Sequence, residues 1–217
     1  MRRVIFWDVD TQHDFISPDG RLYVPGAEVL RSNLQALTDF AHARSIPVIA
    51  TADQHELADA EISAAPDWIT TFPPHCVRGT PGQRKIAETT LRDPLVLEPV
   101  AQDRPALARR IRSHPGDFLI LKTELDAFSN PNTPVLLDTL RPGAVVLYGV
   151  AMDFCDRLAI EGLLRERRQA RLFFVTDAAR AIDPLRGEAL VREWASRGVH
   201  PITTREVVSG QGLEPWL

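Results

Sequence analysis

Short apolar runs alternate with helix-patterned segments along this chain, and this alternation strongly limits the folds it can adopt. Six runs are predicted to form strands, namely Val4–Val9, Ile46–Ala50, Leu95–Leu97, Phe118–Lys122, Ala144–Tyr148 and Arg171–Val175. The three clearest helical segments are Pro134–Leu140, Cys155–Arg168 and Leu185–Arg197. Strands that alternate with helices favour a mostly parallel sheet covered on both faces. We therefore predict an α/β fold of three αβα layers, with a doubly wound sheet of about six strands.

The bulk composition limits both the domain count and the kinds of partner. The 217 residues are 44% hydrophobic and 25% charged, which is ordinary for a globular protein. No repeat or linker is visible, so residues 1–217 are expected to form one domain. The net charge of −4 argues against nucleic-acid or anionic-membrane partners, and no apolar run approaches the ~18 residues of a membrane span. The only two cysteines, Cys76 and Cys155, do not form a disulfide framework, which favours the reducing cytoplasm.

A cysteine stands just beyond the end of one predicted strand. Val145–Tyr148 is a β-branched apolar run, Gly149 is expected to break it, and Asp153 is expected to cap the following helix. Cys155 would then lie in the first helical turn, where unpaired N–H groups and partial positive charge favour a thiolate. Open α/β sheets bind their ligands at this same edge. The alternative is a buried packing cysteine, so the role of Cys155 depends on its partners.

Two further strand ends carry groups that could act with this thiol. Asp10 closes the first strand, and Lys122 ends a later one. The carboxylate could accept the thiol proton, while the ammonium could hold the carboxylate and stabilise negative charge. Taken singly, a loop-capping aspartate and a strand-exit lysine are the simpler interpretations. A phosphatase motif after the first strand fails, because Gln12 stands where that motif requires Thr or Val.

A second group of polar residues could bind a metal. Asp53 and His55 are two residues apart in an extended segment, so their side chains point the same way. His75 returns from a long, proline-rich loop within residues 53–82. One carboxylate and two imidazoles would leave open positions on a metal for water or substrate. Cys76 is expected to pack in the interior, and solvated loop residues are the alternative interpretation of the whole group.

In this order, these residues resemble the isochorismatase-like cysteine hydrolases, and within them the nicotinamidase and pyrazinamidase branch. The resemblance spans nearly the whole chain and implies the isochorismatase-like form of the αβα fold. The matching segments are Asp10–Phe15, Asp53–His55, Pro73–Cys76, Gly79–Gly82, Lys122 and Gly149–Cys155.

The resemblance implies a catalytic triad of Asp10, Lys122 and Cys155. Cys155 would attack a carboxamide carbonyl, and Asp10 would move the thiol proton to the leaving ammonia before water cleaves the thioester. The resemblance also implies a non-proline cis peptide between Val150 and Ala151, with an oxyanion hole formed by the N–H groups of Ala151 and Cys155. The implied reaction is the deamidation of nicotinamide to nicotinate and ammonia, as in NAD salvage.

The same resemblance implies that Asp53, His55 and His75 hold a divalent metal, typically zinc, with iron or manganese possible. Isochorismatase itself lacks these three ligands, which favours the nicotinamidase branch. The metal would bind the pyridine nitrogen of the small amide substrate. Members of the family often form dimers or tetramers, so a homo-oligomer is expected. An apolar wall of the substrate pocket is expected from Phe15, Trp68 or Phe72.

Two departures from the family pattern leave the substrate open. Asp156 follows the nucleophile where the family usually has a small apolar residue, and its charge could either be tolerated by the helix dipole or oppose the thiolate. The segment Glu124–Ser129 follows the nicotinamidase pattern only loosely. The alternatives are therefore a hydrolase of another amide, such as a carbamoyl or ureido compound, and a catalytically silent metal-binding relative.

Overall fold

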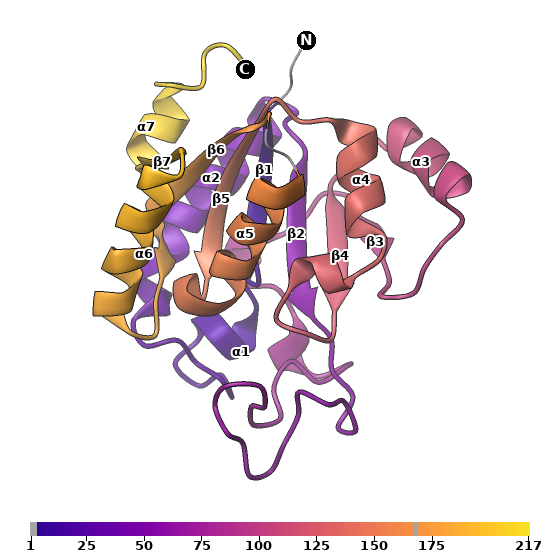
Figure 1. The fold of residues 1–217 in the computed structure, drawn as a ribbon, viewed down its shortest axis with the longest axis vertical. Helices are drawn as coiled ribbons and strands as arrows, with labels where there is room; N and C mark the ends of the chain where they lie inside the picture. Colours follow the sequence, from indigo (N-terminus) through magenta and orange to yellow (C-terminus); the bar gives the residue numbers. More distant parts are fainter. Residues whose placement is uncertain (1–3, 167–168) are drawn as a thin grey trace.

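A single parallel sheet forms the centre of the molecule (Figure 1). The computed structural model describes residues 4–166 and 169–217. The strands are β1 (Val4–Val9), β2 (Val48–Asp53), β3 (Leu95–Leu97), β4 (Phe118–Lys122), β5 (Ala144–Val150), β6 (Arg171–Arg180) and β7 (Val199–Ile202). Their order is β3-β4-β2-β1-β5-β6-β7, and all six pairings are parallel. The predicted αβα class is confirmed, with seven strands rather than about six, because β7 adds an edge strand.

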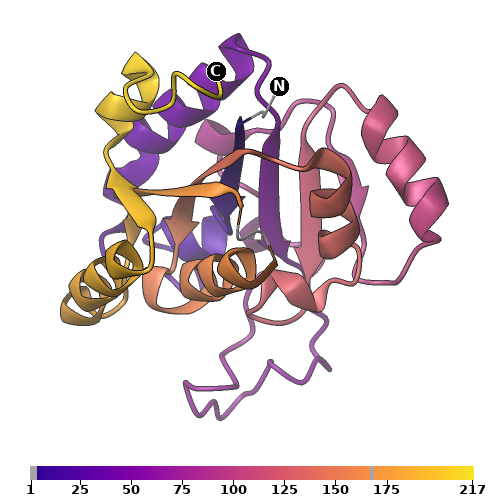
Figure 2. The same ribbon diagram turned by 45° about the horizontal axis from the view of Figure 1, so that its top comes forward.

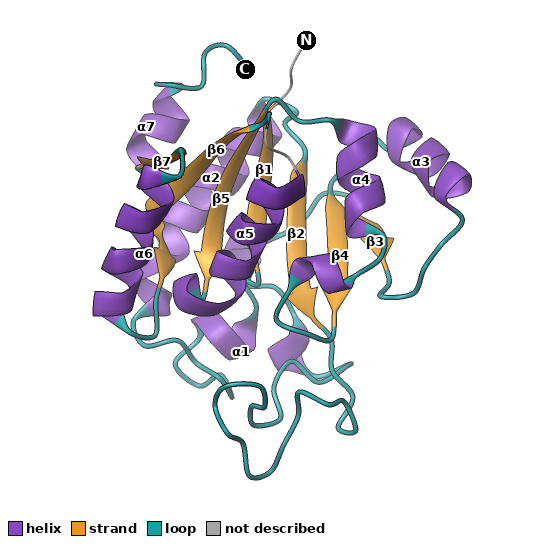
Figure 3. Ribbon diagram, in the orientation of Figure 1, coloured by secondary structure: helices purple, strands orange, loops and turns teal. Residues whose placement is uncertain are grey.

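Helices cover both faces of this sheet, as the colouring by secondary structure shows (Figure 3). The α-helices are α1 (His13–Ile16), α2 (Arg31–Ala43), α3 (Arg104–Ser113), α4 (Thr133–Leu140), α5 (Arg157–Glu166), α6 (Pro184–Ser196) and α7 (Thr204–Ser209). The short helical turns are η1 (Ala27–Leu30), η2 (Pro81–Gln83), η3 (Ala87–Thr89), η4 (Ala127–Ser129) and the π-helical η5 (Met152–Asp156). Helices α3 to α6 bury their apolar side chains on one face, and α1, α2 and α7 do so on the other.

The central strands have two buried faces and are therefore apolar throughout. In β1, Phe6 joins the core beneath α2, whereas its neighbour Trp7 joins the core beneath α5 and stacks on Phe128. This alternation is the period of two expected for a strand between two helical layers. In the described residues, no helix is both long and apolar enough to cross a membrane.

The end of β5 differs from the prediction. The strand continues through Gly149 with a shift in its pairing to β6, so Gly149 does not end it. The φ of Gly149 is 137°, and a Cβ there would lie 2.1 Å from the carbonyl oxygen of Val9. Only glycine allows the two backbones to approach this closely. The peptide bond between Val150 and Ala151 is cis, as predicted.

The helix after β5 also starts differently. Cys155 lies in the π-helical turn η5, which runs directly into the regular helix α5 at Arg157, so it does lie in the first helical turn, although that turn is π-helical and begins at Met152. Asp153 does not cap this helix, because its carboxylate accepts hydrogen bonds from the backbone N–H groups of Ile182 (3.0 Å) and Asp183 (2.9 Å). Positions 167–168 of the predicted helix lie outside the described residues.

The long segment between β2 and η2 is a loop, as its many prolines indicate. It extends beyond the carboxyl ends of the strands (Figure 2). It contains two isolated β-bridges, one between His55 and Val77 and another between Ile62 and Phe72, and several turns. The loop therefore brings its side chains to the edge of the sheet where the candidate site lies.

Candidate active site and metal centre

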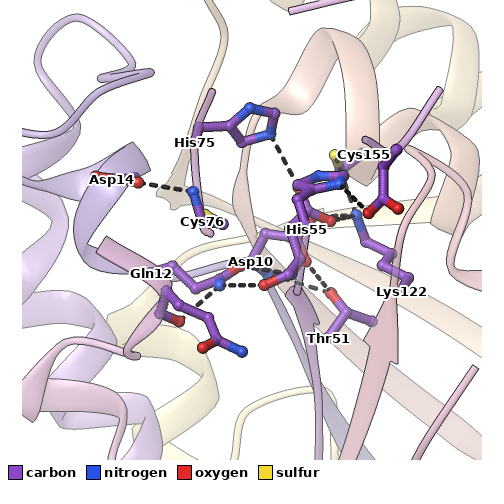
Figure 4. Close-up of polar contacts among 12 residues, drawn as sticks. Asp10, Gln12, Asp14, Thr51, His55, His75, Cys76, Lys122 and Cys155 are labelled. Carbon is purple, nitrogen blue, oxygen red and sulfur yellow. Dashed lines mark hydrogen bonds and ion pairs between the residues drawn. The ribbon is translucent and has the colours of Figure 1, made fainter. Parts of the chain in front are cut away.

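Four strand ends place reactive side chains at one edge of the sheet. Asp10 follows β1, Asp53 ends β2, Lys122 ends β4, and Cys155 follows β5. Because parallel strands share a direction, their carboxyl ends meet at this edge. Figure 4 shows Asp10, Lys122 and Cys155 converging there. The structure therefore brings the three predicted triad residues together.

Lys122 lies at the centre of this group. Its side chain is fully buried, and its Nζ lies 3.0 Å from Oδ2 of Asp10 and 3.8 Å from Sγ of Cys155. The same Nζ also donates to Oδ1 of Asp53, the residue paired with Lys122 in register across β2 and β4. The contact with Asp53 was not predicted, because the sequence alone does not give the strand order.

Burial and charge set the protonation of these groups. Burial alone would lower the pKa of the Lys122 ammonium, but Asp10 and Asp53 raise it well above its ordinary value. Burial raises the pKa of the Cys155 thiol well above its usual range, and the nearby carboxylates oppose the lowering effect of Lys122. This environment favours the thiol of Cys155 and the ammonium of Lys122. Burial therefore opposes the thiolate expected from the helix start.

Asp10 is held by the neighbouring strand. The Thr51 hydroxyl donates to Oδ1 of Asp10 (2.6 Å) and accepts from the backbone N–H of the same residue (3.2 Å). Asp10 adopts a left-handed backbone with a φ of 47°, which is uncommon outside glycine. These contacts fix the direction in which the carboxylate points.

The predicted metal ligands also come together. One ligand atom each from Asp53, His55 and His75 lies within 4.8 Å of the others, and all three residues are buried. Oδ2 of Asp53 lies 3.8 Å from Nε2 of His55 and 3.5 Å from Nε2 of His75. The buried Oδ2 of Asp53 and Nε2 of His55 have no hydrogen-bond partner among the described residues. A divalent cation would satisfy these atoms, and one carboxylate with two imidazoles suits zinc or a similar metal.

Surrounding contacts orient these ligands. Nδ1 of His75 lies within hydrogen-bond distance, 2.8 Å, of the carbonyl oxygen of Pro73. Nδ1 of His55 lies 3.4 Å from Oδ2 of Asp59 but makes no hydrogen bond among the described residues. In His75, an Nδ1–H directed at the carbonyl oxygen leaves Nε2 with the lone pair that binds a metal. Although burial opposes its charge, Lys122 and the two histidines keep the pKa of Asp53 well below its usual range.

Two residues of the first matching segment support the metal group. The Gln12 side chain accepts from the backbone N–H of Asp53 (2.7 Å) and donates to its carbonyl oxygen (2.8 Å). Asp14 accepts from the backbone N–H of Cys76 (2.7 Å), which fixes the turn that carries His75. Cys76 itself is fully buried among apolar side chains, which confirms the prediction that it packs in the interior.

Glu61 is a site residue that the sequence did not reveal. It comes from the long loop, its side chain is almost fully buried, and it lines the same pocket as Asp53 and His75. Burial and the charge of Asp53 raise the pKa of Glu61 to about 7. Its Oε1 has no partner among the described residues, so it could add an oxygen ligand to the metal group. No periodicity in the loop marks this glutamate.

A pocket of about 290 Å³ opens above the reactive group. Cys155 and Ala151 line one part of it, and Asp53, Glu61 and His75 line another. The three residues proposed as an apolar wall, Phe15, Trp68 and Phe72, all line this pocket. The remaining lining residues are Leu22, Tyr23, Val24, Pro25, Leu125, Val150, Phe154 and Ile182. Most of these lie in loops, where spacing carries little information about contacts.

Asp156 does not face this pocket. It is fully buried and precedes Ala159, Ile160 and Leu163 by three, four and seven residues, so it shares the buried side of α5. Neither carboxylate oxygen has a hydrogen-bond partner among the described residues. Burial raises the pKa of Asp156 well above its ordinary value, and nearby aspartates add to the shift. Burial therefore favours the neutral form of Asp156 over a charge beside the nucleophile.

Known proteins match both the sequence and the fold. The chain is 38% identical over 182 residues to a nicotinamidase/pyrazinamidase of Mycobacterium tuberculosis, covering 79% of this chain and 83% of the relative. The pyrazinamidase of Pyrococcus horikoshii, solved in complex with zinc, superimposes with a TM-score of 0.72 at 20% identity over 93% and 99% of the two chains. An isochorismatase family protein of Desulfovibrio vulgaris superimposes with a TM-score of 0.74 at 20% identity over 95% and 97%. The isochorismatase domain family matches residues 5–206, and this chain therefore belongs to that family.

Proposed function

We propose that this hydrolase of amide bonds deamidates nicotinamide to nicotinate and ammonia through a thioester on Cys155. The observation that supports this function is that Cys155, whose Sγ lies beside Lys122 and through it near Asp10, lines one pocket together with Asp53 and His75 of the metal group. A nucleophile beside a base, within reach of a group that can hold a metal, fits the hydrolysis of a small heteroaromatic amide. The nicotinamidase/pyrazinamidase of M. tuberculosis, at 38% identity, supports the same substrate class.

The first step is a proton transfer within the buried triad. The Cys155 proton moves to Asp10, and the thiolate attacks the carboxamide carbon. Lys122 contacts both residues, so the transfer moves negative charge from one neighbour of the ammonium to another. The ease of this step therefore depends on how strongly Cys155 and Asp10 each hold the proton. Because the proton passes to Asp10 and not to water, a raised pKa of the thiol does not prevent the reaction.

The remaining steps use the same groups. The N–H groups of Ala151 and Cys155 would stabilise the tetrahedral oxyanion, a contribution of roughly 3–4 kcal/mol per donor in other hydrolases. Asp10 then protonates the amide nitrogen, the C–N bond breaks, and ammonia leaves. Water gives a proton to Asp10 and its hydroxide cleaves the C–S bond, so that nicotinate leaves and the proton returns to sulfur.

Asp53, His55 and His75 would hold the divalent metal, with zinc preferred for this ligand set. Such a metal supplies a Lewis-acid contact for the pyridine nitrogen of the substrate. Phe15 and Phe72 flank His75, with ring centroids 5.4 Å and 6.3 Å from that imidazole, and would pack against the substrate ring. Among the described lining residues there is no lysine or arginine, which gives carboxylate-bearing carbamoyl or ureido compounds less support.

The test is ammonia release from millimolar nicotinamide by the zinc-loaded protein, with nicotinate quantified by chromatography. We expect turnover that is lost in Cys155→Ala and after chelation, and recovered when zinc is restored. Mass spectrometry after rapid quenching should detect the acyl-enzyme on Cys155. An absence of ammonia with metal bound, under conditions where another amide is hydrolysed, would refute nicotinamide as the substrate.

A further inference from the structure

The pocket above Cys155 is larger than a single pyridine ring requires. Its volume of about 290 Å³ is close to the roughly 300 Å³ at which pockets begin to hold drug-sized ligands. Nicotinamide is a one-ring amide, so it leaves part of this space unfilled. An unfilled apolar volume lowers affinity, because its lining loses contacts that a larger ligand would make.

Two of the polar side chains that line the pocket are acidic. Asp53 and Glu61 line the pocket together with His75, and the described lining includes no lysine or arginine. Lys122 is fully buried and is already engaged by Asp10 and Asp53. A carboxylate carried at the far end of the substrate, away from the metal group, would therefore lose water with no lysine or arginine in the described lining to compensate it.

The leaving-group side of the site is closed. The amide nitrogen must reach Asp10 to receive its proton, and both Asp10 and Lys122 are 0% exposed. A substituent on this nitrogen would have to be buried beside these two side chains, which favours a primary amide. Any additional group must extend from the ring.

The open side of the pocket is apolar. Phe15 and Phe72 form its buried wall, whereas Trp68 is 57% exposed and Ile182 is 45% exposed. These two exposed residues, here called the rim, come from the long loop and from the segment after β6. Large apolar side chains that remain exposed at the mouth of a pocket gain free energy when a ligand covers them.

Both rim residues are held by carboxylates. Asp67 accepts hydrogen bonds from three backbone N–H groups, those of Ile69, Thr70 and Thr71, at 2.8–2.9 Å. This turn holds Trp68 in a left-handed backbone with a φ of 62°, which is an outlier for a bulky residue. Asp153 similarly binds the backbone N–H of Ile182 at 3.0 Å. A rim already held in place loses little conformational entropy on binding.

We propose that the ligand class of this pocket is an uncharged primary carboxamide on a heteroaromatic ring that carries a further apolar group, which packs between Trp68 and Ile182. The proposal rests on the proposed function for the reacting amide and extends it to the far end of the substrate. Amides of similar size that carry a carboxylate in place of the apolar group are excluded.

The test measures binding separately from turnover. Zinc-loaded Cys155→Ala protein is titrated by calorimetry with nicotinamide, with nicotinamides that carry one phenyl group at successive ring positions, and with counterparts that carry a carboxymethyl group. Burial of a phenyl group, discounted for its lost rotation, predicts a Kd about tenfold lower than that of nicotinamide for the best phenyl derivative. The carboxymethyl counterparts should bind more weakly than nicotinamide.

Rim variants show whether the gain comes from the proposed contact. Trp68→Ala and Ile182→Ala, each in the Cys155→Ala background, should remove most of the preference for the phenyl derivative. The matched control is Ile69→Ala, which alters a more exposed neighbour (72%) that does not line the pocket and should keep the preference. The proposal is overturned if no phenyl derivative binds more tightly than nicotinamide, if the carboxymethyl derivatives bind as well, or if the preference survives both rim substitutions.

Turnover by the wild-type protein then separates the two proposals. If nicotinamide is hydrolysed but gains nothing from a phenyl group, the proposed function stands and the extended ligand class is wrong. If the phenyl derivative binds at the rim but no amide is hydrolysed, the ligand class stands and the proposed function is wrong.

Discussion

Replacing Asp156 with leucine is expected to stabilise the protein, and by more at neutral than at acid pH. Asp156 is 0% exposed, both of its carboxylate oxygens are unpartnered among the described residues, and the charges that act on it are those of Asp10, Asp153 and Asp8. Burying an unsatisfied polar group costs about 1–3 kcal/mol, and leucine of similar shape removes this cost at every pH.

The pH-dependent part follows from proton linkage. In the unfolded chain Asp156 ionises near the ordinary aspartate pKa of 3.8, whereas burial raises its pKa well above that value in the folded protein. Above the unfolded pKa the folded state therefore binds more protons, so its stability falls as the pH rises. The loss is about 1.4 kcal/mol per pH unit until the pH reaches the folded pKa. Between about pH 5 and about pH 7 the difference between wild type and Asp156→Leu should thus grow by up to about 2.8 kcal/mol.

Urea unfolding of both proteins at several pH values and one protein concentration measures this difference in the free energy of unfolding. The contributions of the other titrating groups are the same in both proteins and cancel in the difference. Asp156→Asn is the matched control, because it is neutral but still polar. Asp156→Asn should remove the pH-dependent loss of stability but keep most of the cost of burying a polar group without a partner. A difference between wild type and Asp156→Leu that stays flat above about pH 5 would mean that Asp156 is ionised in the folded protein and has a partner, which contradicts the burial argument.

The remaining predictions concern the reacting groups. Cys155→Ala should lower kcat for nicotinamide about 10³-fold or more. Its zinc content, measured by atomic emission, should stay unchanged because Cys155 is outside the metal group, and a loss of zinc would contradict this. His75→Ala should weaken zinc binding at least about 100-fold in a chelator competition, whereas His200→Gln, distant from the site, should bind zinc normally. Thr51→Val removes the 2.6 Å hydrogen bond to Asp10 and should lower kcat roughly tenfold, with activity restored in Thr51→Ser; equal rates for both variants would refute a positioning role.

The clustering of the residues at the strand ends could be predicted because the carboxyl ends of parallel strands lie at one edge of the sheet. Asp10, Lys122 and Cys155 each follow an apolar run, and any αβα order places the carboxyl ends of those runs at one edge. The two-residue spacing of Asp53 and His55 also sufficed to put their side chains together. These relations depend only on local periodicity, which the sequence records directly.

Other features depend on contacts between segments that no local pattern specifies. Glu61 and Ile182 reach the pocket from loops, so neither periodicity nor spacing could identify them. Aspartate is a typical helix cap, yet the carboxylate of Asp153 accepts hydrogen bonds from backbone N–H groups in the segment before α6. The protonation of Cys155 was predicted from the helix end alone, whereas burial beside carboxylates outweighs that effect.

The strand order places Lys122 in contact with both the proposed triad and the proposed metal group. Strand β2 lies between β1 and β4, so Lys122 on β4 must cross the end of β2 to reach Asp10 beyond β1. Asp53 ends β2, and the lysine side chain therefore passes it and donates to it on the way. A shorter cation could not span two strand spacings of roughly 5 Å each. This strand order thus couples the carboxylate of Asp53, which would hold the metal, to the ammonium of Lys122, which faces Cys155. The proposed triad and the proposed metal group would therefore act as one electrostatic unit and not as two independent sites.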